Sequence, residues 1–396
     1  MEPSSLRALA LVAAGLFAAC ATLPSEGGEG SLPNAHAGPF REIAGEELGN
    51  ARTAPHVMED DERFVRDASV VDLDDDPSTL AAAGFFAATL HPEDAPPDPL
   101  APPNAVVRYD AADGRSFERS SVTVLAPELP WEGGTVAAPS AVLVRGEIWL
   151  YYAAAGGIGL ARSADGLAFT REPAPVLAPA ADGDGWERGA IPRSPGVVRL
   201  PDGDGWERGA IPRSPGVVRL PDGSLRMFYE VAGEAGASFL GEARSDDGLA
   251  WERVGGGPAL EPASIVGAGA PEGAGAPAAE GEPFDSAAVS DPAPALAVSA
   301  TGRPLLRVYY AGRDSAGRSA IGLAARLGHD GPLERAVAPV FGASSALSPR
   351  APAVAVYPGF SLLFVTQAAG TRRGQGYPVV AAGVAPADAA LPPPTR

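Results

Sequence analysis

The chain has one cysteine, Cys20, in 396 residues, so no disulfide can form within it. It also lacks any block of lysine or arginine and has a formal net charge of −19, so we do not expect nucleic acid as a partner. The four histidines are scattered, with no metal-ligand spacing. There is no glycine-rich phosphate loop and no nucleophile elbow. We therefore expect no metal and no cofactor, and a monomer.

Long apolar runs are also missing after the first twenty residues, since none reaches the roughly 18 residues that cross a membrane. Residues 1–19 are predicted to be a signal peptide, with Arg7 before the apolar stretch Leu9–Phe17. Residues 17–20, Phe-Ala-Ala-Cys, resemble a lipoprotein cleavage box. Cys20 would then be lipidated; an ordinary signal peptide with an incidental cysteine is the alternative.

Residues 20–62 consist mainly of Gly, Pro, Ser, Ala and acids without a sustained period, which predicts a flexible acidic tether. With the lipid on Cys20, the expected protein is exported and is held at the cell envelope by its lipid anchor only. Ala21 in place of Asp favours the outer membrane.

What the chain does contain is a repeated pattern of short strands, clearest in residues 131–177. Residues 140–144, 148–153 and 158–162 are apolar or aromatic runs bounded by turns, and a fourth run begins at Phe169. The segment therefore predicts one four-stranded, up-and-down antiparallel sheet.

The second strand of this unit recurs in five places, as Phe85-Phe86-Ala87, Tyr151-Tyr152-Ala153, Phe228-Tyr229-Glu230, Tyr309-Tyr310-Ala311 and Phe364-Val365-Thr366. The unit opens with an aromatic residue and an acid, as in Trp131-Glu132, Trp206-Glu207 and Phe284-Asp285. Five such units predict an all-β fold, a five-bladed β-propeller of four-stranded antiparallel blades in residues 63–396, because a unit that cannot bury both faces alone stacks on copies of itself.

Two features of this propeller need an explanation of their own. After Asp388 only AALPPPTR remains, and proline cannot donate to a ladder, so a segment within Phe40–Phe64 should supply the outer strand of blade 5. Residues 182–201 recur unchanged at 202–221, and only one copy fits the blade. The second copy leads directly into residues 225–231, so we expect it in the innermost strand and the first copy looped out between blades 2 and 3.

The stretches YYAAAGGIGLARSADGLAF, EARSDDGLAWERV and FDSAAVSDPAPAL…VYYAGRDSAGRSAIGLA resemble the five-bladed propeller glycosidases of glycoside hydrolase families 32, 43 and 130, over roughly residues 64–390. The resemblance implies carbohydrate as substrate or ligand. Family 43 enzymes carry a base Asp in blade 1, a second Asp in blade 2 and an acid Glu in blade 3, because glycoside cleavage uses two carboxyls across the bond. Only the blade 1 position matches here, and Ala138 stands in blade 2.

In a propeller, the start of each first strand and the end of each second strand open on one face of the central funnel. The residues just before the five first strands are Asp67, Ala138, Ser214, Asp291 and Ala351, with Arg66, Arg213 and Arg350 beside three of them. Glu230 replaces the Ala or Thr that the other blades have at the end of the second strand, and such departures are expected at functional sites.

The candidate catalytic residues are Asp67 as base or nucleophile, Glu230 as general acid with a pKa raised by burial, and Asp291 as the orienting carboxylate. Arg66, Arg213 and Arg350 could bind an acidic sugar or phosphate. The alternatives are that Glu230 only pairs with Arg213, that Asp67 and Asp291 are structural, and that the arginines neutralise acids. The tryptophans are predicted to be core. A glycosidase or phosphorylase, a carbohydrate-binding lipoprotein with a degenerate site and a surface scaffold all remain open.

Overall fold

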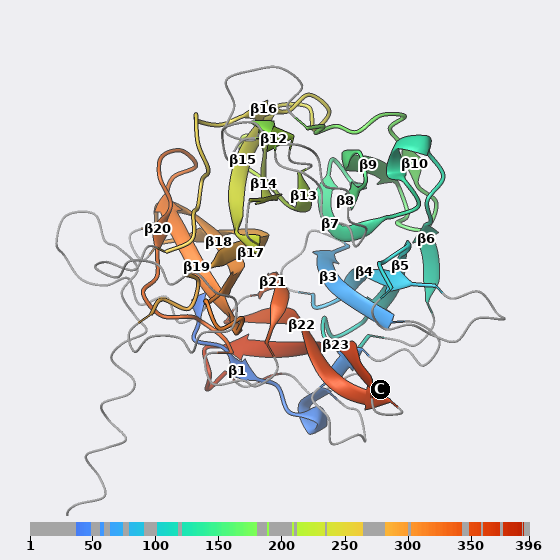
Figure 1. Ribbon diagram of the computed structural model, residues 1–396. Coiled ribbons are helices and arrows are strands. Elements are labelled where there is room, and N and C mark those ends of the chain that lie inside the picture. The colour runs from blue at the N-terminus through green and yellow to red at the C-terminus, as the bar shows by residue number, and fades with distance from the viewer. Residues whose placement is uncertain are drawn as a thin grey trace, which may run out of the picture.

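The computed structural model forms a ring of five antiparallel sheets around a central axis (Figure 1). It describes residues 37–48, 56–58, 64–73, 79–90, 101–117, 121–179, 188–189, 208–209, 212–233, 236–263, 282–299, 302–342, 348–357, 359–372, 375–389 and 391. This is the predicted five-bladed β-propeller. Within the described part of the chain the only helices are 3-10 turns, among them η3 (Gly45–Leu48) and η4 (Pro130–Glu132), and none of them is long and apolar enough to span a membrane.

Each blade runs outwards from an innermost strand in chain order. Blade 1 contains β3 (Phe64–Asp72), β4 (Ala82–Thr89), β5 (Ala105–Ala111) and β6 (Val122–Leu125). Blade 2 contains β7 (Ala137–Val144), β8 (Glu147–Ala154), β9 (Gly157–Ser163) and β10 (Thr170–Arg171). Blade 3 contains β13 (Arg213–Arg219), β14 (Leu225–Ala232), β15 (Ser238–Ser245) and β16 (Glu252–Arg253). Blade 4 contains β17 (Ala288–Val298), β18 (Pro304–Arg313), β19 (Ser319–Leu327) and β20 (Glu334–Arg335).

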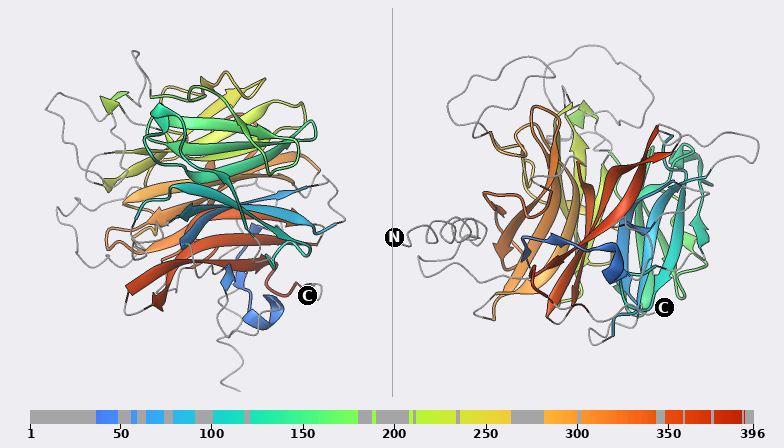
Figure 2. Two further views of the ribbon diagram at one scale, coloured as in Figure 1. Left: turned by 90° about the vertical axis from the view of Figure 1, so that its right-hand side faces the viewer. Right: turned by 90° about the horizontal axis from the view of Figure 1, so that it is seen from below.

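Blade 5 is completed by the N-terminal segment. Its β21 (Arg350–Tyr357), β22 (Phe360–Arg372) and β23 (Gln375–Ala385) come from the end of the chain. Against β23 pair β1 (Arg41–Glu42) and β2 (His56–Met58), both antiparallel, and Figure 2 shows the N-terminal segment beside this last blade. The predicted closure is confirmed: these strands cover an edge that the proline-rich tail could not.

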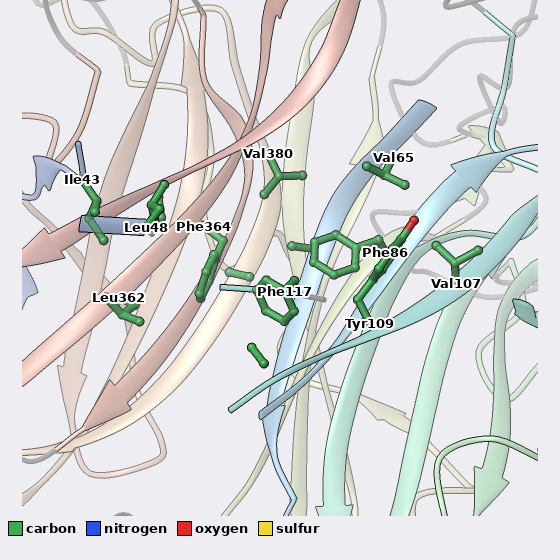
Figure 3. Close-up of a cluster of buried hydrophobic side chains, with 14 of the residues drawn as sticks. Ile43, Leu48, Val65, Phe86, Val107, Tyr109, Phe117, Leu362, Phe364 and Val380 are labelled. Carbon is green, nitrogen blue, oxygen red and sulfur yellow. The ribbon is translucent and has the colours of Figure 1, made fainter. Parts of the chain in front are cut away.

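The recurring aromatic pair of each second strand explains how the blades hold together. Side chains alternate along a strand, so the two members of a pair enter two different interfaces. Tyr151 packs between blades 2 and 3 while Tyr152 packs between blades 1 and 2. In Figure 3, Phe86 of blade 1 and Phe364 of blade 5 lie on either side of Phe117, and the N-terminal segment adds Ile43 to the same cluster.

The tryptophans that the structure describes are partly buried and pack against the core between blades, which agrees with the prediction. Trp131 stacks on Tyr152 with ring centroids 6.0 Å apart, and Trp251 meets Tyr151 edge-on at 5.6 Å. Trp149 packs against the cluster between blades 2 and 3. Trp206 lies outside the described residues.

The second copy of the duplicated segment occupies the innermost strand of blade 3, as expected. It forms β13, and a hydrogen-bonded turn over Leu220–Ser224 leads into β14. The placement predicted for the first copy lies almost entirely outside the described residues. Only its Arg188–Gly189 (β11) is described, paired antiparallel with the equivalent Arg208–Gly209 (β12) of the second copy.

Candidate functional site

Five residues in a left-handed backbone conformation, one in each blade, surround the centre of the ring. They are Asp67, Ala138, Ser214, Asp291 and Ala351, with φ between 44° and 52°. A non-glycine residue in this region is uncommon. These positions were expected just before the first strands, but the structure places them inside β3, β7, β13, β17 and β21.

The reason for this difference is a bulge at the same place in each blade. In each blade the residue just before the left-handed residue is paired with the second strand, and the left-handed residue itself is unpaired. Pairing resumes one residue further on in blade 1 and two residues further on in the other four blades. In blade 3 this register sets Arg213 directly opposite Glu230, and in blade 5 it sets Arg350 opposite Thr366. The bulge turns the side chain at this position towards the central axis. Because every blade has the same bulge, the five side chains come together there.

Together with the residues that follow them, these five positions line one recess. Its volume is about 290 Å³ including the part open to solvent, and its lining is Asp67, Ala68, Ala138, Pro139, Ser214, Pro215, Asp291, Pro292, Ala351 and Pro352. Two of the predicted acids, Asp67 and Asp291, therefore lie in one pocket. Glu230 is not among the lining residues, and its exposed fraction is 4%.

Asp67 is half-buried in the recess. Its backbone N–H donates to Thr366 Oγ1 at 2.8 Å, which ties blade 1 to blade 5. Burial raises the pKa of the Asp67 carboxyl, the negative charge of Asp291 raises it further, and the guanidinium groups of Arg350 and Arg66 oppose the rise.

Asp291 is the most widely bonded of the three acids. Its Oδ1 lies 3.0 Å from Ser214 Oγ, and its Oδ2 accepts from Ser290 Oγ and from the backbone N–H of Ala351, both at 3.3 Å. These partners belong to blades 3, 4 and 5. Asp291 thus joins three blades at the recess.

Glu230 does not line the recess, but it contacts Ser214, which does. Its Oε1 pairs with the guanidinium of Arg213, and its Oε2 lies 3.2 Å from Ser214 Oγ. Burial raises the pKa of the Glu230 carboxyl, as predicted; Arg213 opposes this rise and Asp291 adds to it. The pairing with Arg213 is the alternative foreseen from the sequence, and it is present together with the link to Asp291.

The three predicted arginines have different surroundings. Arg66 is buried and donates to Thr89 Oγ1 at 3.0 Å and to the carbonyl of Ala101 at 3.1 Å. Arg213 forms an ion pair with Glu230. Arg350 is exposed and close enough to influence the Asp67 carboxyl. Of the three, Arg350 is the most exposed to solvent, and it follows Pro349 directly before the recess residue Ala351.

Sequence reasoning identified the acids but gave no role to the hydroxyl groups around them. Ser214, Ser290 and Thr366 each contact an acid or its backbone. A signal was available at two of them: Ser214 stands where blades 2 and 5 have alanine, and Thr366 where three blades have alanine. Among the described residues, no group of three or more His, Cys, Asp and Glu side chains is arranged to hold a metal ion.

Comparison with known proteins supports the fold. No protein-family model matches the chain, and no curated protein matches it. Solved structures do match. A glycosyl hydrolase from Bacteroides ovatus is 13% identical with a TM-score of 0.58, the match covering 95% of this chain and 99% of that one. A thermostable family-43 glycoside hydrolase is 14% identical with a TM-score of 0.53, covering 87% and 100%. The chain is similar in fold to these glycoside hydrolases.

Proposed function

We propose that the protein acts on carbohydrate and cleaves glycosidic bonds with three carboxyl groups, Asp67, Glu230 and Asp291. One observation carries this proposal: Asp67 and Asp291 line one recess, and Ser214 Oγ links Asp291 to Glu230 at 3.0 and 3.2 Å, so acids from blades 1, 3 and 4 meet at one end of the funnel. Perturbed acids in a recess are typical of catalytic sites. The solved glycoside hydrolases that share the fold support the same choice of substrate class.

In this proposal the roles follow from the surroundings of each acid. Asp67 lines the recess where a substrate would lie, which suits a base or nucleophile; burial raises the pKa of its carboxyl, and Arg350 and Arg66 oppose this rise. Burial favours the protonated form of Glu230, which suits the source of the proton that the leaving oxygen receives. Asp291 holds the hydroxyl of Ser214 and raises the pKa of the other two acids.

A second candidate is carbohydrate binding without cleavage. Two observations favour it: blade 2 offers only Ala138 at the recess, and the pairing with Arg213 favours the ionised form of Glu230. The two functions differ in what Asp67 and Glu230 must do, so they can be separated by experiment.

The test is a glycan array followed by turnover assays on the sugars that bind. We expect Asp67→Asn and Glu230→Gln each to lower kcat by about 10²- to 10⁴-fold, the usual contribution of a positioned acid or base. Glu252→Gln is the matched control. Glu252 is an exposed acid on the outer strand of blade 3, and it pairs with Arg244 of the neighbouring strand β15. Binding in the wild type without turnover of any bound sugar would reject cleavage in favour of the second candidate.

The exposed guanidinium beside Asp67 also suggests a preference. We propose that Arg350 contacts an acidic sugar or a phosphate acceptor, since Arg66 and Arg213 already have other partners. Arg350→Gln should raise KM for a uronic acid glycoside more than for its neutral counterpart. An equal effect on both substrates would count against this role.

Attachment to the cell envelope through Cys20 is a further proposal that rests on residues 1–20 of the sequence. The wild type should incorporate radiolabelled palmitate in a bacterial host and sediment with membranes. Cys20→Ser should do neither, and an unlabelled wild type would contradict the proposal.

A further inference from the structure

Ser214 stands between two carboxyl groups that belong to different blades. Its Oγ lies 3.0 Å from Asp291 Oδ1 and 3.2 Å from Glu230 Oε2. A serine hydroxyl carries one proton and can donate only one hydrogen bond, whereas an ionised carboxyl can only accept. If both acids were ionised, one of the two contacts would have no hydrogen between its oxygen atoms.

Both contacts are satisfied when one of the two acids is protonated. In one arrangement Glu230 Oε2–H donates to Ser214 Oγ, and Ser214 Oγ–H donates to Asp291 Oδ1. In the other arrangement both bonds point the opposite way. The two interconvert when one proton moves from Glu230 to Ser214 as another moves from Ser214 to Asp291, so the serine stays neutral and keeps a single proton.

The remaining contacts support the ionised form of either acid. Glu230 Oε1 faces Arg213, and Asp291 Oδ2 accepts from Ser290 Oγ and Ala351 N–H. In either arrangement, the oxygen of the ionised carboxyl that does not face Ser214 still has a donor. Asp67 is the third acid nearby, and Arg350 and Arg66 partly offset its charge.

We infer that Ser214 passes a proton between Glu230 and Asp291: Glu230 Oε2–H gives its proton to Ser214 Oγ while Ser214 Oγ–H gives its proton to Asp291 Oδ1. Protonated Asp291, which lines the recess, then donates this proton to the leaving oxygen of the substrate, and Glu230 is left ionised beside Arg213. The inference rests on the proposed function. It explains how Glu230, which does not line the recess, can serve as the source of a proton there. Ser214 is then a positioning residue and not a nucleophile, since no base is needed to ionise its hydroxyl.

The chain itself indicates that Ser214→Ala will fold. The equivalent residues of blades 2 and 5 are Ala138 and Ala351, which adopt the same left-handed conformation at φ of 44° and 48°. Ser214 has a φ of 48°. An alanine at this position therefore removes the hydroxyl without changing the bulge.

The test compares two substrates with the same sugar, one with an alkyl leaving group that needs a proton and one with a dinitrophenyl leaving group that does not. We expect Ser214→Ala to lower kcat by about 10²-fold on the alkyl glycoside and by less than about threefold on the dinitrophenyl glycoside. Glu230→Gln should show the same selectivity. Ser140→Ala is the control: its hydroxyl accepts from Val217 N–H in a contact between blades 2 and 3, so any loss should be equal on both substrates.

An equal loss on the two substrates in Ser214→Ala, or no loss, would overturn the relay while leaving the proposed function intact. If the wild type cleaves neither substrate, the proposed function fails and infrared spectroscopy decides about the shared proton. We expect the band of a protonated carboxyl at neutral pH that shifts in Ser214→Ala and disappears in the Glu230→Gln, Asp291→Asn double variant. A spectrum without such a band would overturn the inference whatever the activity.

Discussion

Two groups of acids in this propeller are held in different ways. Glu132 and Asp285, which open blades 2 and 4, are both 0% exposed. Each is bound by a tyrosine of the second strand and an arginine of the fourth strand in its own blade. Asp67, Asp291 and Glu230 at the recess share partners across blades instead. Burial of an acid therefore does not by itself mark a functional site.

The two groups of acids differ in whether each carboxyl oxygen has a hydrogen-bond donor of its own. Both oxygens of Glu132 have donors: Tyr152 Oη at 2.7 Å and Arg171 on Oε1, and the backbone N–H groups of Glu128 and Leu129 on Oε2. At the recess, the single proton of Ser214 faces two carboxyls. Matched donors favour one charge state, whereas the shared hydroxyl permits two.

The largest effect should come from removing an acid of the first kind. Glu132→Ala removes the nearest carboxylate of the Arg171 guanidinium, which is 12% exposed and keeps only the exposed Glu128 at 3.8 Å and the carbonyl of Ala126. It also leaves the buried hydroxyl of Tyr152 without its acceptor. Breaking one side of a buried ion pair costs about 3–5 kcal/mol, so unfolding in urea should begin at a much lower concentration. A midpoint as high as that of the exposed control Glu252→Gln would show that this acid is not structural.

The donors of these acids should matter less than the acids themselves. Tyr310→Phe removes the hydroxyl that donates to Asp285 at 2.7 Å, while Arg335 still pairs with that carboxyl at 3.0 Å. The expected loss in the free energy of unfolding is about 1.5–3 kcal/mol, the range for one hydrogen bond to a charged group. Tyr152→Phe should behave alike in blade 2. If neither substitution changes stability, the tyrosine hydroxyls are not needed: Arg335 holds Asp285, and Arg171 with the backbone N–H groups of Glu128 and Leu129 holds Glu132.

The contribution of the recess acids to the free energy of unfolding should fall as the pH rises, unlike that of an acid whose pKa is lowered by folding. Burial raises the folded-state pKa of Glu230 above its unfolded value, so the group favours folding below the unfolded pKa and loses this contribution as pH rises through the folded pKa. Relative to the wild type, Glu230→Gln should become more stable as the pH rises above about 4.3, the ordinary pKa of a glutamate in an unfolded chain. Urea unfolding at several pH values measures this change.

Asp67→Asn should show the same trend, because burial raises the pKa of Asp67 too. Asp165 is the contrast: hydrogen bonds from the N–H groups of Leu167 and Ala168 lower its pKa to about 2. Its contribution is present above the unfolded pKa and is lost as the pH falls through about 2. A pH dependence in Glu230→Gln identical to that of the wild type would mean that Glu230 is not perturbed.

The architecture could be predicted from the sequence because its signals are repeated. One aromatic pair per blade fixes the second strands, and the proline-rich tail fixes the need for an N-terminal closing strand. The contacts at the recess could not be predicted, because they depend on the bulge. A shift of one residue decides that Arg213, and not Ser214, lies opposite Glu230. No glycine marks these left-handed positions; only a following proline does so, and in blade 1 it is absent.

The smallest effect should come from deleting residues 182–201, which tests whether blade 3 takes its recess residues from the second copy alone. That copy supplies Arg213 and Ser214, and its Leu220–Ser224 turn closes with hydrogen bonds of 2.8 and 2.9 Å. The deletion removes β11 and shortens a connection, which changes loop entropy by about 1 kcal/mol or less.

The thermal midpoint of the deletion variant should therefore stay within a few degrees of the wild type, and the pH dependence due to Glu230 should persist. Deleting residues 202–221 would give the same polypeptide, so the matched control replaces 182–201 with twenty Gly and Ser residues and keeps the length. If the deletion variant unfolds while this control stays folded, the length of the connection is essential. If both unfold, the sequence of the first copy is part of the fold.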